Sequence, residues 1–291
     1  MSYWQLHRPL LFILFGDIIN LKVRVYGGVF LQFFVYFLLA LFATTVGSLT
    51  GMGGGVIIKP LMDVLGDYDV KTIGIVSSIT VFSMAIVSVL KQIKAKTEIP
   101  YKNAIPLGIG SVAGGFLGEK LLTFIVNLFN ANSVVTVVQN CVLTVLVLCV
   151  FLYMKNKRKI KGKEWDGVFV SLAVGVFLGV CSSFLGIGGG PINVALIIFL
   201  FSVNTKTATV CSLVTILFAQ ISKLTTVALT TGFSNFDLSI APLMIIGAIF
   251  GGFIGAGLNK KCSEKTVEKA FNCVQLLVLG IAIFNIIRNL I

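Results

Sequence analysis

Two long stretches of this chain carry no charged residue: neither residues 121–154 nor residues 167–205 contain Asp, Glu, Lys or Arg. An uncharged apolar run of about 18 residues or more is long enough to cross a bilayer as a helix. The chain as a whole is 57% hydrophobic and 12% charged, whereas an average soluble domain is roughly 25% charged. A water-soluble fold could not bury that much apolar surface. The sequence therefore predicts an all-α polytopic membrane protein of the cell membrane.

The net charge of +12 comes from basic residues in short runs between the apolar segments, as in residues 155–165. Such runs are typical of cytoplasmic loops, whereas nucleic-acid binding requires a basic stripe on a polar fold. We expect the lipid bilayer as a partner and no nucleic acid. His7 is the only histidine, and the six cysteines form no CxxC pair. We therefore expect no metal site, no cofactor and no catalytic residue, and we interpret the protein as a non-enzyme.

Apolar length divides the chain into two series of five segments. The first series is predicted at 28–50, 56–66, 72–91, 103–126 and 133–154, and the second at 167–185, 191–202, 207–226, 236–258 and 266–288. The predicted domains are an N-terminal interfacial segment (1–26), a first transmembrane repeat (27–154), a basic cytoplasmic loop (155–165) and a second transmembrane repeat (166–291).

The two series resemble each other in sequence. The cluster GMGGG at 51–55 aligns with GIGGG at 186–190, and at the same offset Ser77 meets Ser212 and Thr80 meets Thr215. Matched features in the same order along several segments indicate an internal duplication, whereas one shared glycine cluster would be weak support.

Lysine positions indicate how the two repeats are oriented. The first series has lysines between its third and fourth segments, but the equivalent stretch 226–235 is uncharged, and lysines follow one loop later. Equivalent loops would then lie on opposite sides of the membrane, which favours an inverted repeat. Inversion requires an odd number of crossings in each repeat, which is met if a glycine-broken hairpin that does not cross is followed by about three spanning helices. The short partners 56–66 and 191–202 suit such a hairpin, being roughly 17 Å long. Eight full crossings in two parallel repeats remain the alternative.

The glycine clusters at 51–55 and 186–190 predict breaks in the first helix of each repeat. A broken backbone is tolerated in hydrocarbon only where protein or a water-filled cavity satisfies its polar groups. The short helix after each cluster would point its free N–H groups and partial positive charge at the break, so two such termini near the midplane would form an anion site. Close helix packing is the alternative role for the clusters. Packing is our interpretation for the glycine rows with four-residue spacing, Gly110, Gly114 and Gly118, and Gly247, Gly251 and Gly255.

Polar side chains near the breaks add candidates. Hydroxyls on the third segment of each series could donate to an oxyanion or bond to the carbonyl four residues earlier. Lys59 could attract an anion, whereas we expect Lys223 to extend toward the lipid headgroups. Asp63, Glu119 and Asp237 fall near segment ends, so no carboxylate proton relay is visible. The candidate substrate-binding residues are Gly51, Gly53, Gly54, Gly55, Lys59, Ser77, Thr80, Gly186, Gly188, Gly189, Gly190, Pro191, Ser212 and Thr215.

The stretches GSLTGMGGG (47–55) and GVCSSFLGIGGGP (179–191), together with the duplication, resemble the TauE/SafE sulfite exporter family, also known as toluene-sulfonate uptake permeases. The resemblance covers residues 28–288. It implies a plasma-membrane permease for a small sulfur-containing anion such as sulfite, a sulfonate or a related oxyanion. Alternating access is the expected mechanism. A passive anion channel and a non-transporting membrane assembly subunit are the alternatives. The particular anion, the direction of transport, a coupling ion (H+ or Na+) and a homodimer stay open.

Overall fold

The computed structural model describes residues 29–95, 97, 100–129, 132–157, 159–160, 162–165 and 167–290. The regular elements in these ranges are all helices, which confirms the all-α prediction. They are α2 (Val29–Thr50), α3 (Gly55–Leu65), α4 (Val70–Lys94), α5 (Tyr101–Phe129), α6 (Asn132–Asn156), α7 (Val168–Leu185), α8 (Pro191–Phe201), α9 (Thr205–Thr230), η2 (Phe233–Asn235), α10 (Ala241–Lys261) and α11 (Glu264–Leu290). Eight of them are long and apolar enough to cross a membrane. The predicted interfacial segment 1–26 lies outside the described residues.

Helix ends differ from the predicted ones where capping residues intervene. α4 and α9 each begin two residues earlier than predicted, because Asp69 and Asn204 accept hydrogen bonds from the first backbone N–H groups. α10 begins later than predicted, at Ala241, because Pro242 favours the first turn of a helix.

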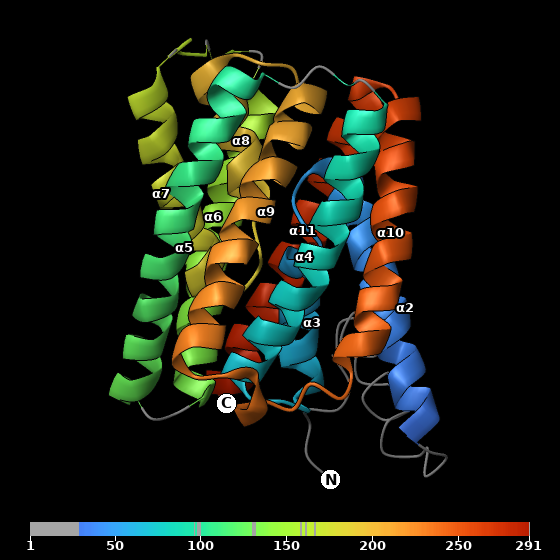
Figure 1. The fold of residues 1–291 in the computed structure, drawn as a ribbon, viewed down its shortest axis with the longest axis vertical. Helices are drawn as coiled ribbons and strands as arrows, with labels where there is room; N and C mark the ends of the chain where they lie inside the picture. Colours follow the sequence, from blue (N-terminus) through green and yellow to red (C-terminus); the bar gives the residue numbers. More distant parts are fainter. Residues whose placement is uncertain are drawn as a thin grey trace, which may run out of the picture.

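Each short helix forms a hairpin with the long helix before it. The Tyr36 hydroxyl of α2 donates to the Asp67 carboxylate beyond α3 at 2.6 Å, and the Trp165 N–H before α7 donates to the Leu200 carbonyl of α8 at 2.8 Å. In both hairpins the end of the short helix therefore lies beside the beginning of the long helix, at the same end of the bundle. In Figure 1 the α3–α4 connection lies at the lower end and the α8–α9 connection at the upper end. The hairpins thus enter from opposite ends, an arrangement consistent with the predicted inverted repeat.

The halves interlock through their glycine rows. α10 packs on α2, and α5 packs on α7, so each hairpin lies against a helix of the other half. A Cβ added at Gly251 of α10 would lie 2.7 Å from the Leu41 carbonyl oxygen, and one at Gly114 of α5 would lie 2.8 Å from the Val176 carbonyl carbon. These glycines therefore permit backbone-to-backbone contact, which confirms the packing interpretation. α4 and α9 pack against each other and are the most buried of the spans.

We expect Gly114→Ala to lower the free energy of unfolding by about 1–3 kcal/mol, because the added methyl group overpacks the α5–α7 contact. Gly280→Ala on α11 is the matched control, since a Cβ there meets no atom within 4 Å. Unfolding of both detergent-purified proteins would be compared by thermal melting. Equal stability of the two variants would contradict the close contact.

Lysines gather at one end of the bundle. Lys91 and Lys94 end α4, Lys155 lies in the last turn of α6, and Lys260 and Lys261 end α10. All three helices end at the upper end in Figure 1. The α3–α4 connection at the opposite end carries Asp67 and Asp69 instead.

Candidate functional site

The two glycine breaks meet inside the bundle. Gly51 and its equivalent Gly186 have left-handed backbones (φ 76° and 65°), as do Gly53 and Gly188 (φ 74° and 64°). All residues of both breaks are buried. A Cβ at Gly53 would lie 3.0 Å from the Gly188 carbonyl oxygen, so the backbones touch directly. The breaks thus share left-handed glycines at two equivalent positions but differ at the next, where Gly54 has a φ of −66° and Gly189 a φ of 117°, and together they form one crossing.

Both short helices begin at this crossing. α3 starts at Gly55 after the N-cap Gly54, and α8 starts at Pro191 after the N-cap Gly190; neither N-cap supplies a side-chain hydrogen bond. The backbone N–H groups of Ile57 and Ile58 donate to the Gly54 carbonyl. The two helices run away from the crossing in opposite directions (Figure 1). Their partial positive charges therefore face each other.

One face of α9 and one of α4 cover the crossing. From α9, the Ser212 hydroxyl donates to the Gly51 carbonyl at 2.6 Å, and the Gln220 amide nitrogen lies 3.1 Å from where a Gly188 Cβ would be. From α4, the Ser77 hydroxyl oxygen lies 2.9 Å from the position that a Cβ on Gly55 would occupy. Helical spacing places Ser212 and Gln220 on one side of α9.

The predicted hydroxyls divide into three roles. The Thr80 hydroxyl donates to the Val76 carbonyl and the Thr215 hydroxyl to the Cys211 carbonyl. Both hydroxyls thus bond to the carbonyl four residues earlier and are not free to donate to an anion. Ser212 holds the first break. Ser77 is fully buried, and its hydroxyl has no hydrogen-bond partner within the described part of the chain.

Gln220 is absent from the predicted site residues. Its side chain is fully buried, and neither amide atom finds a partner in the described ranges. A buried amide without partners is costly, so it marks a place where a ligand or water would bind. Its position two turns after Ser212 on the same helix face is the sequence signal that points to it.

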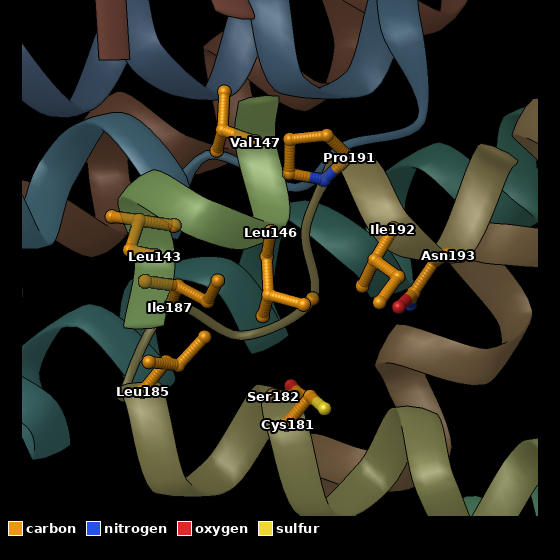
Figure 2. A pocket seen from close by; sticks show the side chains of 11 residues that line it. Leu143, Leu146, Val147, Cys181, Ser182, Leu185, Ile187, Pro191, Ile192 and Asn193 are labelled. Carbon is orange, nitrogen blue, oxygen red and sulfur yellow. The ribbon is translucent and has the colours of Figure 1, made fainter. Parts of the chain in front are cut away.

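A small cavity adjoins the second break. It lies between α6, α7 and α8 and measures about 10 Å³, which is about the size of one water molecule. Figure 2 shows Ser182 and Asn193 at its edge among apolar side chains. The Ser182 hydroxyl and the side-chain amide oxygen of Asn193 have no hydrogen-bond partner in the part of the chain that the structure describes. The cavity is too small for an oxyanion.

Comparison with known proteins decides the family. The profile of the sulfite exporter TauE/SafE family matches residues 36–283. The chain belongs to this family. Among curated relatives, the probable membrane transporter protein YunE of Bacillus subtilis is 27% identical over 274 residues, 85% of this chain and 96% of its own length. The probable membrane transporter protein YjnA of Bacillus subtilis is 25% identical over 247 residues, 79% and 92% of the two chains. No solved structure matches the chain.

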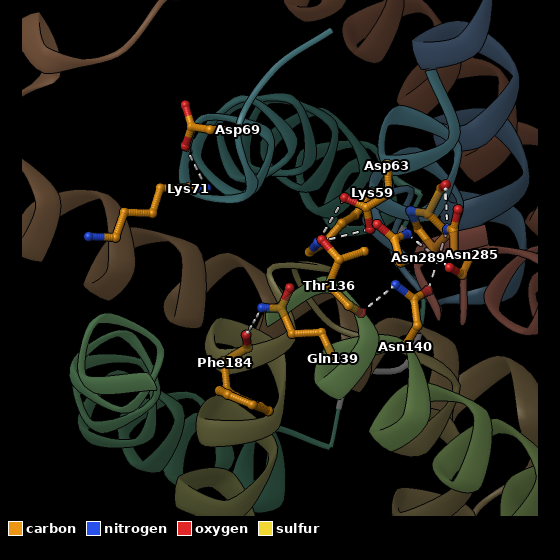
Figure 3. A network of polar contacts seen from close by, with 11 residues as sticks. Lys59, Asp63, Asp69, Lys71, Thr136, Gln139, Asn140, Phe184, Asn285 and Asn289 are labelled. Carbon is orange, nitrogen blue, oxygen red and sulfur yellow. Dashed lines mark hydrogen bonds and ion pairs between the residues drawn. The ribbon is translucent and has the colours of Figure 1, made fainter. Parts of the chain in front are cut away.

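Lysines and carboxylates of this TauE/SafE protein pair inside the bundle. Lys59 and Asp63 are both buried, with 3.1 Å between the Lys59 Nζ and the nearer carboxylate oxygen (Figure 3). The Lys59 side chain packs against the other half's break, where a Gly186 Cβ would lie 3.2 Å from its Cδ. Lys59 thus contacts the crossing, but its charge is already paired.

The prediction that Lys223 extends to the headgroups is wrong. Its side chain is 1% exposed and its Nζ lies 3.5 Å from a Glu119 carboxylate oxygen. The reason is that α9 lies at the centre of the bundle, and Lys223 is on its buried face. Asp63 and Glu119 lie late in α3 and α5, and their side chains are only 2% and 14% exposed where they pair with Lys59 and Lys223. Asp237, before α10, is exposed.

Proposed function

We propose that the protein is a permease for a small sulfur-containing anion, such as sulfite or a sulfonate, and that it works by alternating access. The observation that carries the proposal is the crossing of two uncapped helix N-termini beside the buried, unpartnered side chains of Ser77 and Gln220. These groups supply hydroxyl, amide and backbone N–H donors, which suit the oxygens of an anion. The proposal includes no catalytic step and no cofactor.

The closed crossing supports a carrier over a passive channel. The two break backbones are in contact, so a path through them opens only if the halves move. The interlocked packing of α2 on α10 and of α5 on α7 provides two bodies that could rock against each other. If the protein were a non-transporting assembly subunit, the buried hydrogen-bond donors at the crossing would have no role. We propose that the lysine-rich end is cytoplasmic.

The test is counterflow in liposomes that contain the purified protein. Vesicles preloaded with sulfite, thiosulfate, sulfate, sulfoacetate or taurine would be diluted into a trace of the labelled compound. A carrier accumulates label transiently and saturates, whereas a channel equilibrates with the membrane potential. Imposed H+ and Na+ gradients test for a coupling ion. Absence of flux for every compound in the panel would refute the proposal.

We expect Ser77→Ala to raise the KM for the transported anion by about tenfold or more, because a hydrogen bond to a charged group contributes about 1.5–3 kcal/mol. Stability should change little, since the Ser77 hydroxyl leaves no partner behind. Ser78→Ala is the matched control, because the neighbouring hydroxyl donates to the Gly74 carbonyl at 2.6 Å. Equal KM values in the two variants would exclude Ser77 from the site.

A further inference from the structure

The buried charges of the bundle lie on one side of the crossing. Lys59 and Asp63 are on α3, which runs from the first break to the lower end of the bundle in Figure 1. Glu119 and Lys223 lie in the second halves of α5 and α9, which both run toward that end. The sequence repeat assigns Val194, Ile198, Ala256 and Ser88 to the equivalent positions above the crossing. The two sides therefore differ in chemistry although the backbone is similar: one is charged and the other neutral.

Lys223 is the one of these charges that lacks close partners. Its Nζ lies 3.4 Å from the Gly74 carbonyl, 3.5 Å from the Ser183 carbonyl and 3.5 Å from Glu119. Good hydrogen bonds from nitrogen to oxygen span about 2.7–3.2 Å. The Lys59 ammonium, in contrast, holds both Asp63 oxygens at 3.1 and 3.2 Å. A buried ammonium with three donors and only loose acceptors is poorly compensated.

The surroundings of Lys223 favour an anion. The Ser183 hydroxyl beside it is fully buried and has no partner among the described residues. The side chains of Lys59 and Lys223 both approach Gly74: a Gly186 Cβ would lie 3.2 Å from the Lys59 Cε and 3.3 Å from the Gly74 Cα, and a Gly74 Cβ would lie 3.6 Å from the Lys223 Nζ. Glu119 balances the charge of Lys223. Its side chain is 14% exposed, more than those of Lys223, Lys59 and Asp63, so it can move away from Lys223 more easily than they can move.

We propose that Lys223 and Ser183 form a second anion subsite, on the α3–α4 side of the crossing, which binds a small oxyanion in place of Glu119. The inference rests on the proposed function and adds a second binding position for the anion, outside the crossing. The neutral side, with Ser88 and Val194 at the equivalent positions, offers no such point. The apparent affinity for the anion therefore differs between the two faces of the membrane.

The experiment uses two variants of the full chain with opposite expected effects. Glu119→Gln removes the competing carboxylate and should lower the Kd of the anion several-fold. Lys223→Met combined with Glu119→Gln removes the cation while keeping the charge balanced, and should raise the Kd at least tenfold. If Lys223 and Glu119 formed only a structural ion pair, the two variants would not change the Kd of the anion in opposite directions. The Kd values come from the melting temperature of the purified protein as a function of sulfite, sulfoacetate, sulfate or phosphate concentration.

The outcomes separate this inference from the proposed function. If sulfite or sulfoacetate binds wild type and both variants equally, the subsite is refuted and the proposed function stands. If only phosphate binds, with the expected dependence on Lys223, the subsite stands and the proposed substrate class fails. If none of the four anions changes the melting temperature of the wild type, both are refuted.

Discussion

Gly55→Ala is expected to abolish transport and to destabilise the protein. The added methyl group would lie 2.5 Å from the Ile187 carbonyl carbon and would overlap its oxygen. Backbone at this contact cannot rotate away as a side chain can, so the two breaks would be pushed apart. Because overpacking typically costs about 1–3 kcal/mol, we expect a loss at or above the top of that range. Thermal melting and uptake into liposomes would measure the two effects.

Gly190→Ala provides the matched control for stability. Gly190 occupies the equivalent position in the second break, but its φ of 170° is extended and open to any residue. The nearest atom to its added Cβ is the Ile187 Cδ1 at 3.1 Å, the flexible end of a side chain. We expect its melting temperature to stay near that of the wild type. If Gly55→Ala melts at the same temperature as Gly190→Ala, the backbone contact between the breaks is incorrect.

Lys59→Met should lower the free energy of unfolding by about 3–5 kcal/mol, because it leaves the Asp63 carboxylate buried without its cation. Both side chains are at most 3% exposed, so water cannot replace the lost partner. Chemical denaturation of the purified protein would measure the loss. Met matches the length and apolar stem of Lys, so the loss would report the charge rather than a cavity.

The double variant Lys59→Met/Asp63→Asn tests the cause of that loss. It removes both charges together and should recover most of the stability, because buried ion pairs are often replaceable by neutral groups of similar volume. A double variant as unstable as Lys59→Met would show that packing of the Lys59 side chain on Gly186, rather than the ion pair, stabilises this region.

Helix positions and breaks were predictable because their signals are local. Uncharged length identifies the spanning helices, and the glycine clusters identify where α2 and α7 end. The lower end of α3 follows from Gly66, which adopts the left-handed conformation as its C-cap. The inverted repeat stays a prediction, since lysine positions favour it without excluding parallel repeats.

Pairing between distant side chains was not predictable from position along a helix. Asp63 lies near the end of α3, and its position alone does not indicate that it is buried. In the structure α11 covers that end, with the Asn285 amide donating to the Pro60 carbonyl at 2.9 Å and Arg288 donating to the Val64 carbonyl. Likewise, nothing local indicates that Lys223 on α9 meets Glu119 on α5. Such contacts depend on which helix faces pack together, which the position of a residue along its own helix does not show.

The cross-packing of the hairpins constrains the order in which the chain assembles during synthesis. α2 fits against the glycine row of α10, whose residues Gly247, Gly251 and Gly255 are translated about 200 residues later. At roughly 5–20 residues per second, the first hairpin waits about 10–40 s for that partner. α7 has no such delay, because α5 precedes it on the ribosome. The second hairpin can therefore dock as it emerges, whereas the first completes its docking only when the chain is nearly finished.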